Sequence, residues 1–184
     1  MKRKPWPTIG GALLAGLAWL AACDTTDRQR IERVLVDRAP WLDESARREI
    51  ARAVTTVARS HEIDPWLLLA VIEVESTYRF DAHSRRGAVG LMQVKPLAAT
   101  EVAEAVGAEW TSHSDLLVPA RNVAVGAAYL VQLKRRFRTW DGALTAYNRG
   151  PGRAGAAGPV LTSRYAKRVL RVHASMLEQA NGSP

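Results

Sequence analysis

The residue best suited to chemistry is Glu75, a carboxyl at the end of an apolar run. Residues 66–74 read Trp-Leu-Leu-Leu-Ala-Val-Ile-Glu-Val. Apolar surroundings disfavour the charged form of a carboxyl, and the partial negative charge at the C-terminal end of a helix acts in the same direction. We therefore expect a raised pKa for Glu75, which suits a general acid of the kind found in glycosidase sites. A glutamate that is simply solvated at a helix end is the alternative.

A second glutamate, Glu73, precedes Glu75 by two positions. Two residues along a helix correspond to a rotation of about 200°, so Glu73 is expected to face away from Glu75. We predict that Glu73 takes no part in the chemistry.

Capping residues, prolines and apolar spacing predict the elements that position Glu75. Asp64 followed by Pro65 predicts the start of a helix, and a run this apolar predicts a buried central helix. Residues 84–94 predict a short hairpin with Gly87 at its turn. Residues 150–159 hold four glycines and two prolines, which predicts a loop. Further helices are predicted over residues 26–38, 43–60, 96–106, 119–137, 139–148 and 163–179.

The first 22 residues have the layout of a secretory signal peptide. Lys2, Arg3 and Lys4 precede an uncharged run, which is shorter than the about 20 apolar residues that cross a bilayer. Leu-Ala-Ala-Cys at 20–23 resembles the lipobox of bacterial lipoproteins, which implies cleavage before Cys23 and lipidation of its thiol. A chance cysteine after an ordinary signal peptide is the alternative. We predict a signal peptide over 1–22, a lipid-anchored segment over 23–42 and one domain over 43–180.

This reading places the protein in the periplasm, anchored through lipidated Cys23 to the inner or the outer membrane. Removal of the signal peptide would lower the formal net charge from +8 to +5. A basic surface suits nucleic acid, anionic lipid or a wall polymer that bears carboxylates. Export disfavours nucleic acid, and a basic surface that is only solvated remains an alternative. We expect no metal and no cofactor, because no His or Cys cluster suggests a site for one.

Short motifs in a fixed order extend the case for Glu75. They are Glu-Ser at 75–76, Ser84, Gly-Ala-Val-Gly-Leu-Met-Gln at 87–93, Ala-Tyr-Asn-Arg-Gly-Pro-Gly-Arg at 146–153, and Tyr165. Together they resemble the lytic transglycosylases of the soluble-enzyme type, a branch of the lysozyme superfamily. The resemblance covers about residues 55–175. It implies a mainly α, lysozyme-like fold of the goose type, with a small β-hairpin beside the substrate groove. In its size and lipobox the chain is similar to the small membrane-anchored members.

The resemblance also implies roles for individual residues. The catalytic acid falls on Glu75, and Met92 and Gln93 would give the sugar groove an apolar wall and an amide donor and acceptor. Tyr165 would reach the reacting sugar. The alternatives are a core-filling Met92, a purely structural Asn148 and a Tyr165 that packs between helices. The full set of expected substrate-binding residues is Ser84, Gly90, Met92, Gln93, Tyr147, Asn148 and Tyr165.

The chain departs from the family pattern in two places. Arg79 and Phe80 stand where the family often has Asn-Pro or Asp-Pro, and Arg149 replaces a common alanine. Both changes lie close to the expected groove and remove no chemical group that the reaction needs. They bear on subsite preference more than on activity.

The implied activity is non-hydrolytic cleavage of the β-1,4 bond between N-acetylmuramic acid and N-acetylglucosamine in peptidoglycan glycan strands, which leaves 1,6-anhydro ends. A hydrolytic muramidase is one alternative. It needs a second carboxylate about 6.5–9.5 Å from the first, and Asp81 is the candidate. A wall-binding scaffold lipoprotein without catalysis is the other alternative. Cell-wall or secretion-machinery proteins are compatible as further partners.

Overall fold

The computed structural model describes residues 26–103, 113–155 and 162–182, and the predicted lipidation site Cys23 lies outside them. Residues 26–38 are helical, as predicted, and no strand occurs among the described residues. The remaining elements are α2 (Glu44–Ser60), α3 (Pro65–Ser76), α4 (Pro96–Val102), the 3-10 helix η2 (His113–Leu117), α5 (Pro119–Phe137), α6 (Trp140–Arg149), α7 (Pro151–Gly155) and α8 (Arg164–Gly182).

Helix α3 is the buried central helix that the apolar run predicts. It starts at Asp64, whose Oδ1 accepts a hydrogen bond from the backbone N–H of Trp66 at 2.9 Å, and Pro65 occupies the first helical position. Every residue from Trp66 to Ile72 is buried. The helix ends in two consecutive left-handed residues, Thr77 with φ 50° and Tyr78 with φ 63°. The chain therefore turns sharply just after Glu75.

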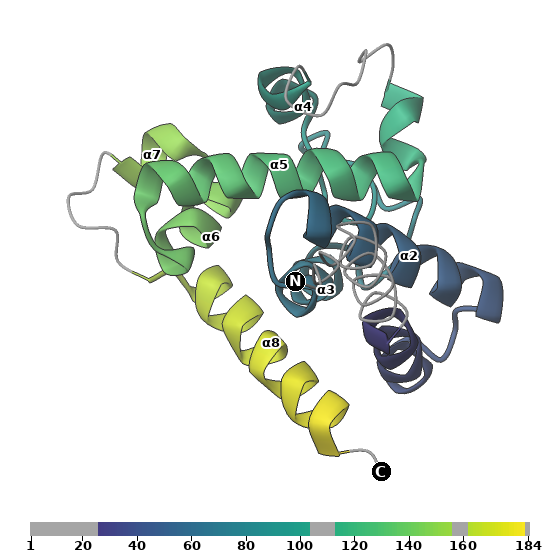
Figure 1. Ribbon diagram of the computed structural model, residues 1–184. Coiled ribbons are helices and arrows are strands. Elements are labelled where there is room, and N and C mark those ends of the chain that lie inside the picture. Colours follow the sequence, from purple (N-terminus) through teal and green to yellow (C-terminus); the bar gives the residue numbers. More distant parts are fainter. Residues whose placement is uncertain (1–25, 104–112, 156–161, 183–184) are drawn as a thin grey trace, which may run out of the picture.

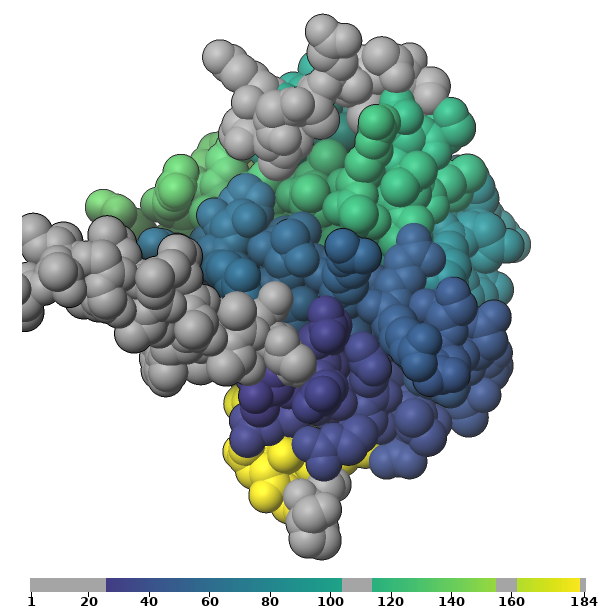
Figure 2. Space-filling view, turned by 45° about the vertical axis from the view of Figure 1, so that its right-hand side comes forward, coloured from purple at the N-terminus to yellow at the C-terminus, as the bar shows by residue number. Residues whose placement is uncertain are grey.

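Long helices surround α3. Figure 1 shows α5 running across the molecule, with α6 and α7 near one of its ends and α2 near the other. Helix α5 packs against α2, α4 and α6, while α8 packs against α3 and α6. Residues 26–38 share this core, because Ile31 and Leu35 are fully buried in it. Figure 2 shows these residues, in purple, beside the end of α8, in yellow.

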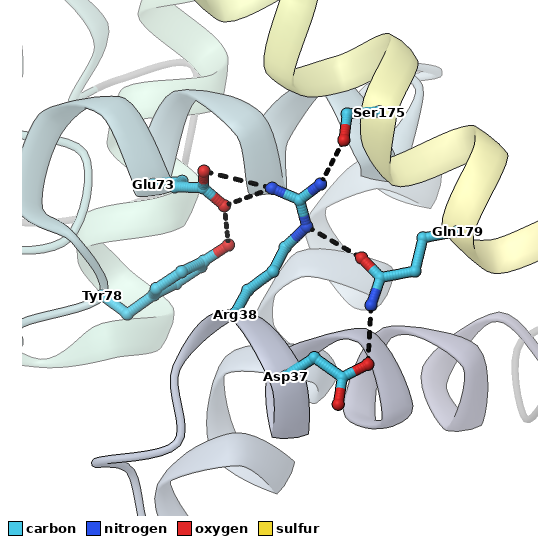
Figure 3. A network of polar contacts seen from close by, with 6 residues as sticks. All are labelled: Asp37, Arg38, Glu73, Tyr78, Ser175 and Gln179. Atoms are coloured by element: carbon cyan, nitrogen blue, oxygen red, sulfur yellow. Dashed lines mark hydrogen bonds and ion pairs between the residues drawn. The ribbon is translucent and has the colours of Figure 1, made fainter.

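A polar network joins residues 26–38 to the back of α3 and to α8 (Figure 3). Arg38 Nη1 donates to both carboxylate oxygens of Glu73, at 3.2 and 3.1 Å. Arg38 also donates to Ser175 Oγ at 2.6 Å and to Gln179 Oε1 at 3.0 Å. The buried Tyr78 hydroxyl donates to Glu73 Oε2 at 2.7 Å. Glu73 thus serves this network, on a different side of α3 from Glu75.

Two segments, 84–94 and 150–159, differ in part from their predicted structures. The segment 82–94 forms isolated antiparallel bridges between His83 and Val89 and between Val89 and Val94, so the β-hairpin is not confirmed as a pair of strands. The prediction of a loop over 150–159 was wrong for Pro151–Gly155, which form α7. Pro151 suits the first turn of a helix, and the backbone N–H of Ala154 donates to the carbonyl of Gly150 at 3.1 Å.

Candidate active site

A hollow of about 400 Å³ opens beside the C-terminal end of α3, with Glu75 among its lining residues. One wall comes from the segment that includes Ser84 and Gln93 and from α4. The other walls come from Tyr129 of α5 and from the junction of α6 and α7. The sharp turn after α3 and the packing of α5 on both α4 and α6 bring these segments together.

Glu75 has the environment of a general acid. Burial raises the pKa of Glu75, while the hydrogen bond from Tyr165 and the positive charge of Arg168 lower it by less. The Tyr165 hydroxyl donates to Glu75 Oε1 at 2.6 Å. Burial, and next the charge of Glu75, raise the pKa of Tyr165 well above its ordinary value. Tyr165 is therefore a neutral donor that reaches Glu75 from α8.

A second tyrosine, Tyr147 of α6, lines the same hollow. Its hydroxyl donates to the backbone carbonyl of Met92 at 2.8 Å. The centroid of its ring lies 5.7 Å from the centroid of the Tyr129 ring, and the two ring planes are tilted by 52°. Burial raises the pKa of Tyr147 well above its ordinary value, and the charge of Glu75 raises it further. Tyr147 thus connects α6 to the Gly-Leu-Met-Gln segment beside the acid.

A buried pair, Thr145 and Ser163, fixes the two tyrosines relative to each other. The backbone N–H of Ser163 donates to Thr145 Oγ1 at 3.2 Å. Ser163 Oγ in turn accepts from the backbone N–H of Ala166 at 3.1 Å, which caps the first turn of α8. The start of α8 is therefore attached to α6 next to Tyr147 and Tyr165. This pair was not among the residues predicted from the sequence, although a serine before a helical run is a known capping signal.

The Gly-Leu-Met-Gln segment is held by Asn122 of α5, a residue that was not predicted from the sequence either. Asn122 Oδ1 accepts from the backbone N–H of Met92 at 2.7 Å, and Nδ2 donates to the carbonyls of Val89 and Leu116, both at 2.8 Å. Gly90 has φ 75°, and a Cβ there would lie 2.3 Å from Asn122 Nδ2. In the sequence, Asn122 is recognisable as an isolated amide residue on the apolar face of a predicted helix.

The family motif contributes fewer groove residues than its length suggests. Met92 is fully buried, and a Cβ on Gly126 would lie 2.6 Å from the Met92 sulfur. Neither Met92 nor Gly90 lines the hollow, although both belong to the set of expected substrate-binding residues. Gln93 does line it, and its amide group donates to the carbonyls of Ala82 and Gly90 at 3.0 Å. No described residue donates a hydrogen bond to Oε1 of Gln93.

Of the other expected residues, Ser84 and Asn148 both line the hollow. Ser84 Oγ accepts from the backbone N–H of Ala88 at 2.9 Å and stabilises the turn there. Asn148 is exposed, and its side chain makes no hydrogen bond to any described residue. Asp81 is exposed and lies outside the lining of the hollow, whereas Glu101 of α4 belongs to it. Glu101 was not anticipated, because nothing in its local sequence distinguishes it from a solvated helix residue.

Two general features of the described part of the chain bear on metal binding and on membrane crossing. It contains no group of three or more His, Cys, Asp or Glu residues that could hold a metal ion. Over the same ranges, no helix has both the length and the apolar character that crossing a bilayer requires.

Comparison with known proteins identifies the family. The transglycosylase SLT domain matches residues 53–160, which is more than half of the chain. The chain belongs to this family. The matched span includes Glu75, Asn122 and Tyr147 of this SLT-family chain, whereas Tyr165 and residues 26–38 lie outside it.

Individual relatives of this SLT-family chain are lytic transglycosylases by name. It is 35% identical over 135 residues to membrane-bound lytic murein transglycosylase C of Shigella sonnei, a match that covers 66% of this chain and 37% of the relative. The 70 kDa soluble lytic transglycosylase of Escherichia coli is similar in structure, with 25% identity and a TM-score of 0.61 over 79% of this chain and 29% of that one. An inactive glutamate-to-glutamine mutant of the lytic transglycosylase Slt of Pseudomonas aeruginosa gives a TM-score of 0.63 at 24% identity, over 84% of this chain and 30% of that one.

These comparisons support the mainly helical fold expected from the sequence, with a domain similar to part of the soluble lytic transglycosylases. This chain spans only about a third of the length of the relatives named here.

Proposed function

We propose that this SLT-family chain cleaves the β-1,4 bond between N-acetylmuramic acid and N-acetylglucosamine without water and leaves 1,6-anhydro ends. The main observation that supports this proposal concerns Glu75. Its carboxyl has a raised pKa, lines the hollow and accepts a hydrogen bond from Tyr165. The names of the three relatives support the proposal. So does the loss of activity in the Pseudomonas protein, whose inactive form has a glutamine in place of a glutamate.

In the proposed reaction Glu75 acts first as an acid and then as a base. The protonated carboxyl gives its proton to the bridging oxygen as the bond from that oxygen to C1 of the muramoyl unit breaks. The N-acetyl carbonyl of the same unit stabilises the positive centre at C1. Glu75, now a carboxylate, takes the proton of the 6-hydroxyl, whose oxygen bonds to C1 and closes the anhydro ring. One group can serve both steps because the second reverses its protonation state.

Tyr165 supports this alternation. Its hydroxyl donates to Glu75 Oε1 at 2.6 Å, and a hydrogen bond to a carboxylate is stronger than one to a neutral carboxyl. The contact therefore stabilises the carboxylate that exists between the two proton transfers. The 6-hydroxyl needs no second carboxylate to reach C1, because it belongs to the same sugar and has a high effective concentration there.

An inverting hydrolase would instead need a base for water on the opposite face of the sugar, about 6.5–9.5 Å from the acid. Asp81 does not line the hollow, so Glu101 is the better candidate for that base. The two readings differ in their products. Hydrolysis adds water and leaves a reducing end, while transglycosylation adds nothing.

The test is the mass of fragments released from purified peptidoglycan, before and after borohydride treatment. We expect fragments lighter by one water than those of a lysozyme and resistant to reduction, from the unmodified protein and from Asp81→Asn and Glu101→Gln alike. Reducible ends that disappear in Glu101→Gln would establish a hydrolase. Binding to the wall without any released fragment would favour the scaffold.

We further propose a lysozyme-like fold of the goose type and an anchor at Cys23 in a bacterial membrane, facing the periplasm. The Leu-Ala-Ala-Cys sequence supports the anchor. The Shigella relative is named as membrane-bound, which agrees with it.

A further inference from the structure

Two positively charged side chains, those of Arg86 and Lys95, line the hollow that holds Glu75. Both residues are exposed. Neither side chain makes a hydrogen bond or an ion pair with any residue that the structure describes. Other basic residues do form ion pairs, such as Arg38 with Glu73 and Arg121 with Asp115. The charges of Arg86 and Lys95 are thus available to a ligand.

The sugars of the glycan give these charges no partner. N-acetylglucosamine and N-acetylmuramic acid offer hydroxyl and amide groups, and the lactyl carboxyl of the muramic acid is bound to the peptide as an amide. The attached peptide carries free carboxylates, and it is bound to the muramic acid, the sugar at whose C1 the bond breaks. Leu97, 73% exposed, lies in the same wall as Lys95 and offers apolar contact to alanine side chains of such a peptide.

We propose that Arg86 and Lys95 bind carboxylates of the peptide attached to the muramic acid, so that the chain prefers glycan whose peptide carboxyls are ionised. This inference rests on the proposed function, because it assumes that the glycan lies along the hollow. A guanidinium can bind a carboxylate through two parallel hydrogen bonds, while an ammonium acts as a point charge. Glu101 lies in the same lining and repels a carboxylate, so its charge opposes the two cations.

The probe is a matched pair of soluble, uncross-linked glycan strands. One carries native peptides, and in the other the peptide carboxyls have been converted to primary amides with a carbodiimide and ammonia. Dissociation constants are measured on full-length protein that carries Glu75→Gln, so that neither strand is cleaved. We expect about tenfold tighter binding of the native strands, as for two partly solvated ion pairs, and we expect salt to reduce this preference.

Variants in the same background locate the charges responsible. Arg86→Met with Lys95→Met should abolish the preference for native strands, and Glu101→Gln should increase it. The control is Arg30→Met with Arg33→Met, which removes the same net charge from exposed positions in residues 26–38, outside the lining of this hollow. The control should keep the full preference.

Equal binding of the two strands by the Glu75→Gln protein would overturn the inference. So would a preference that survives in the Arg86 and Lys95 double variant, or one that the control loses to the same extent. The proposed function fails on a different result, the absence of anhydro ends among the products. Because binding is measured without cleavage, each failure can be recognised separately.

Discussion

Replacing Glu73 and Glu75 singly by glutamine makes the same chemical change at two positions of α3 that face different partners. Glu75→Gln keeps the size and polarity of the side chain but leaves no proton to give to the leaving oxygen. General acid–base catalysis contributes about 10²–10⁴-fold. Since Glu75 serves both proposed steps, the loss of activity should reach the top of that range or exceed it. The fold should be unharmed, because a buried carboxyl with a raised pKa is replaced by a neutral group.

Glu73→Gln should instead reduce stability. The substitution removes the charge that pairs with Arg38 at 3.1 Å and accepts from Tyr78 at 2.7 Å. The Arg38 and Glu73 side chains are only 18% and 21% exposed, so the cost lies between that of an exposed ion pair and that of a buried hydrogen bond to a charge. We estimate about 1–2 kcal/mol. For a chain of this size the melting temperature should fall by about 2–8 °C.

The assay combines thermal unfolding with the rate of fragment release from purified peptidoglycan, measured well below both melting temperatures. Glu75→Gln should lose activity and keep its melting temperature, and Glu73→Gln should do the reverse. Equal losses of activity would refute the assignment of the two glutamates to different roles. An unchanged melting temperature in Glu73→Gln would show that the network of Figure 3 contributes little to stability.

Activity should fall as pH rises through the raised pKa of Glu75, because only the protonated acid can start the reaction; a rate that keeps rising into the alkaline range contradicts this role. Tyr165→Phe removes the hydrogen bond that lowers the pKa of Glu75, so the alkaline limb of the pH–rate profile should move to higher pH, and an unmoved limb would show that the contact does not tune the acid. Asn122→Ala leaves the Met92 N–H and the Leu116 carbonyl without their side-chain partner, while the Val89 carbonyl keeps its bond from the Val94 N–H; the change should cost about 2–4 kcal/mol in urea unfolding, with a loss under 1 kcal/mol contradicting its role. Cys23→Ala should move the protein from the membrane fraction to the soluble periplasm, and retention after a salt wash would contradict the lipid anchor.

The helices were predictable because their signals are local. Asp64 with Pro65 fixes the start of α3, and Asp43 and Thr139 cap α2 and α6 through bonds to residues three positions ahead. An apolar run as continuous as the one before Glu75 can only be buried. Burial in turn raises the pKa of Glu75, as expected.

The missing parts depend on contacts between distant segments. Asn122 lies 30 residues from Met92, and Arg38 lies 35 residues from Glu73. The family motif locates the Gly-Leu-Met-Gln segment but not the direction of each side chain. Met92 points inward because Gly126 of α5 leaves room for the Met92 sulfur. No local sequence pattern predicts this contact.

In the proposed reaction, Glu75 drives ring closure by the substrate's own hydroxyl, without water. Digestion of purified peptidoglycan in ¹⁸O-labelled water tests it most directly, by mass spectrometry of the new muramic acid ends. We expect anhydro ends that carry no label, formed by the unmodified protein and lost in Glu75→Gln. Labelled reducing ends as the main product, or anhydro ends that persist in Glu75→Gln, would contradict it.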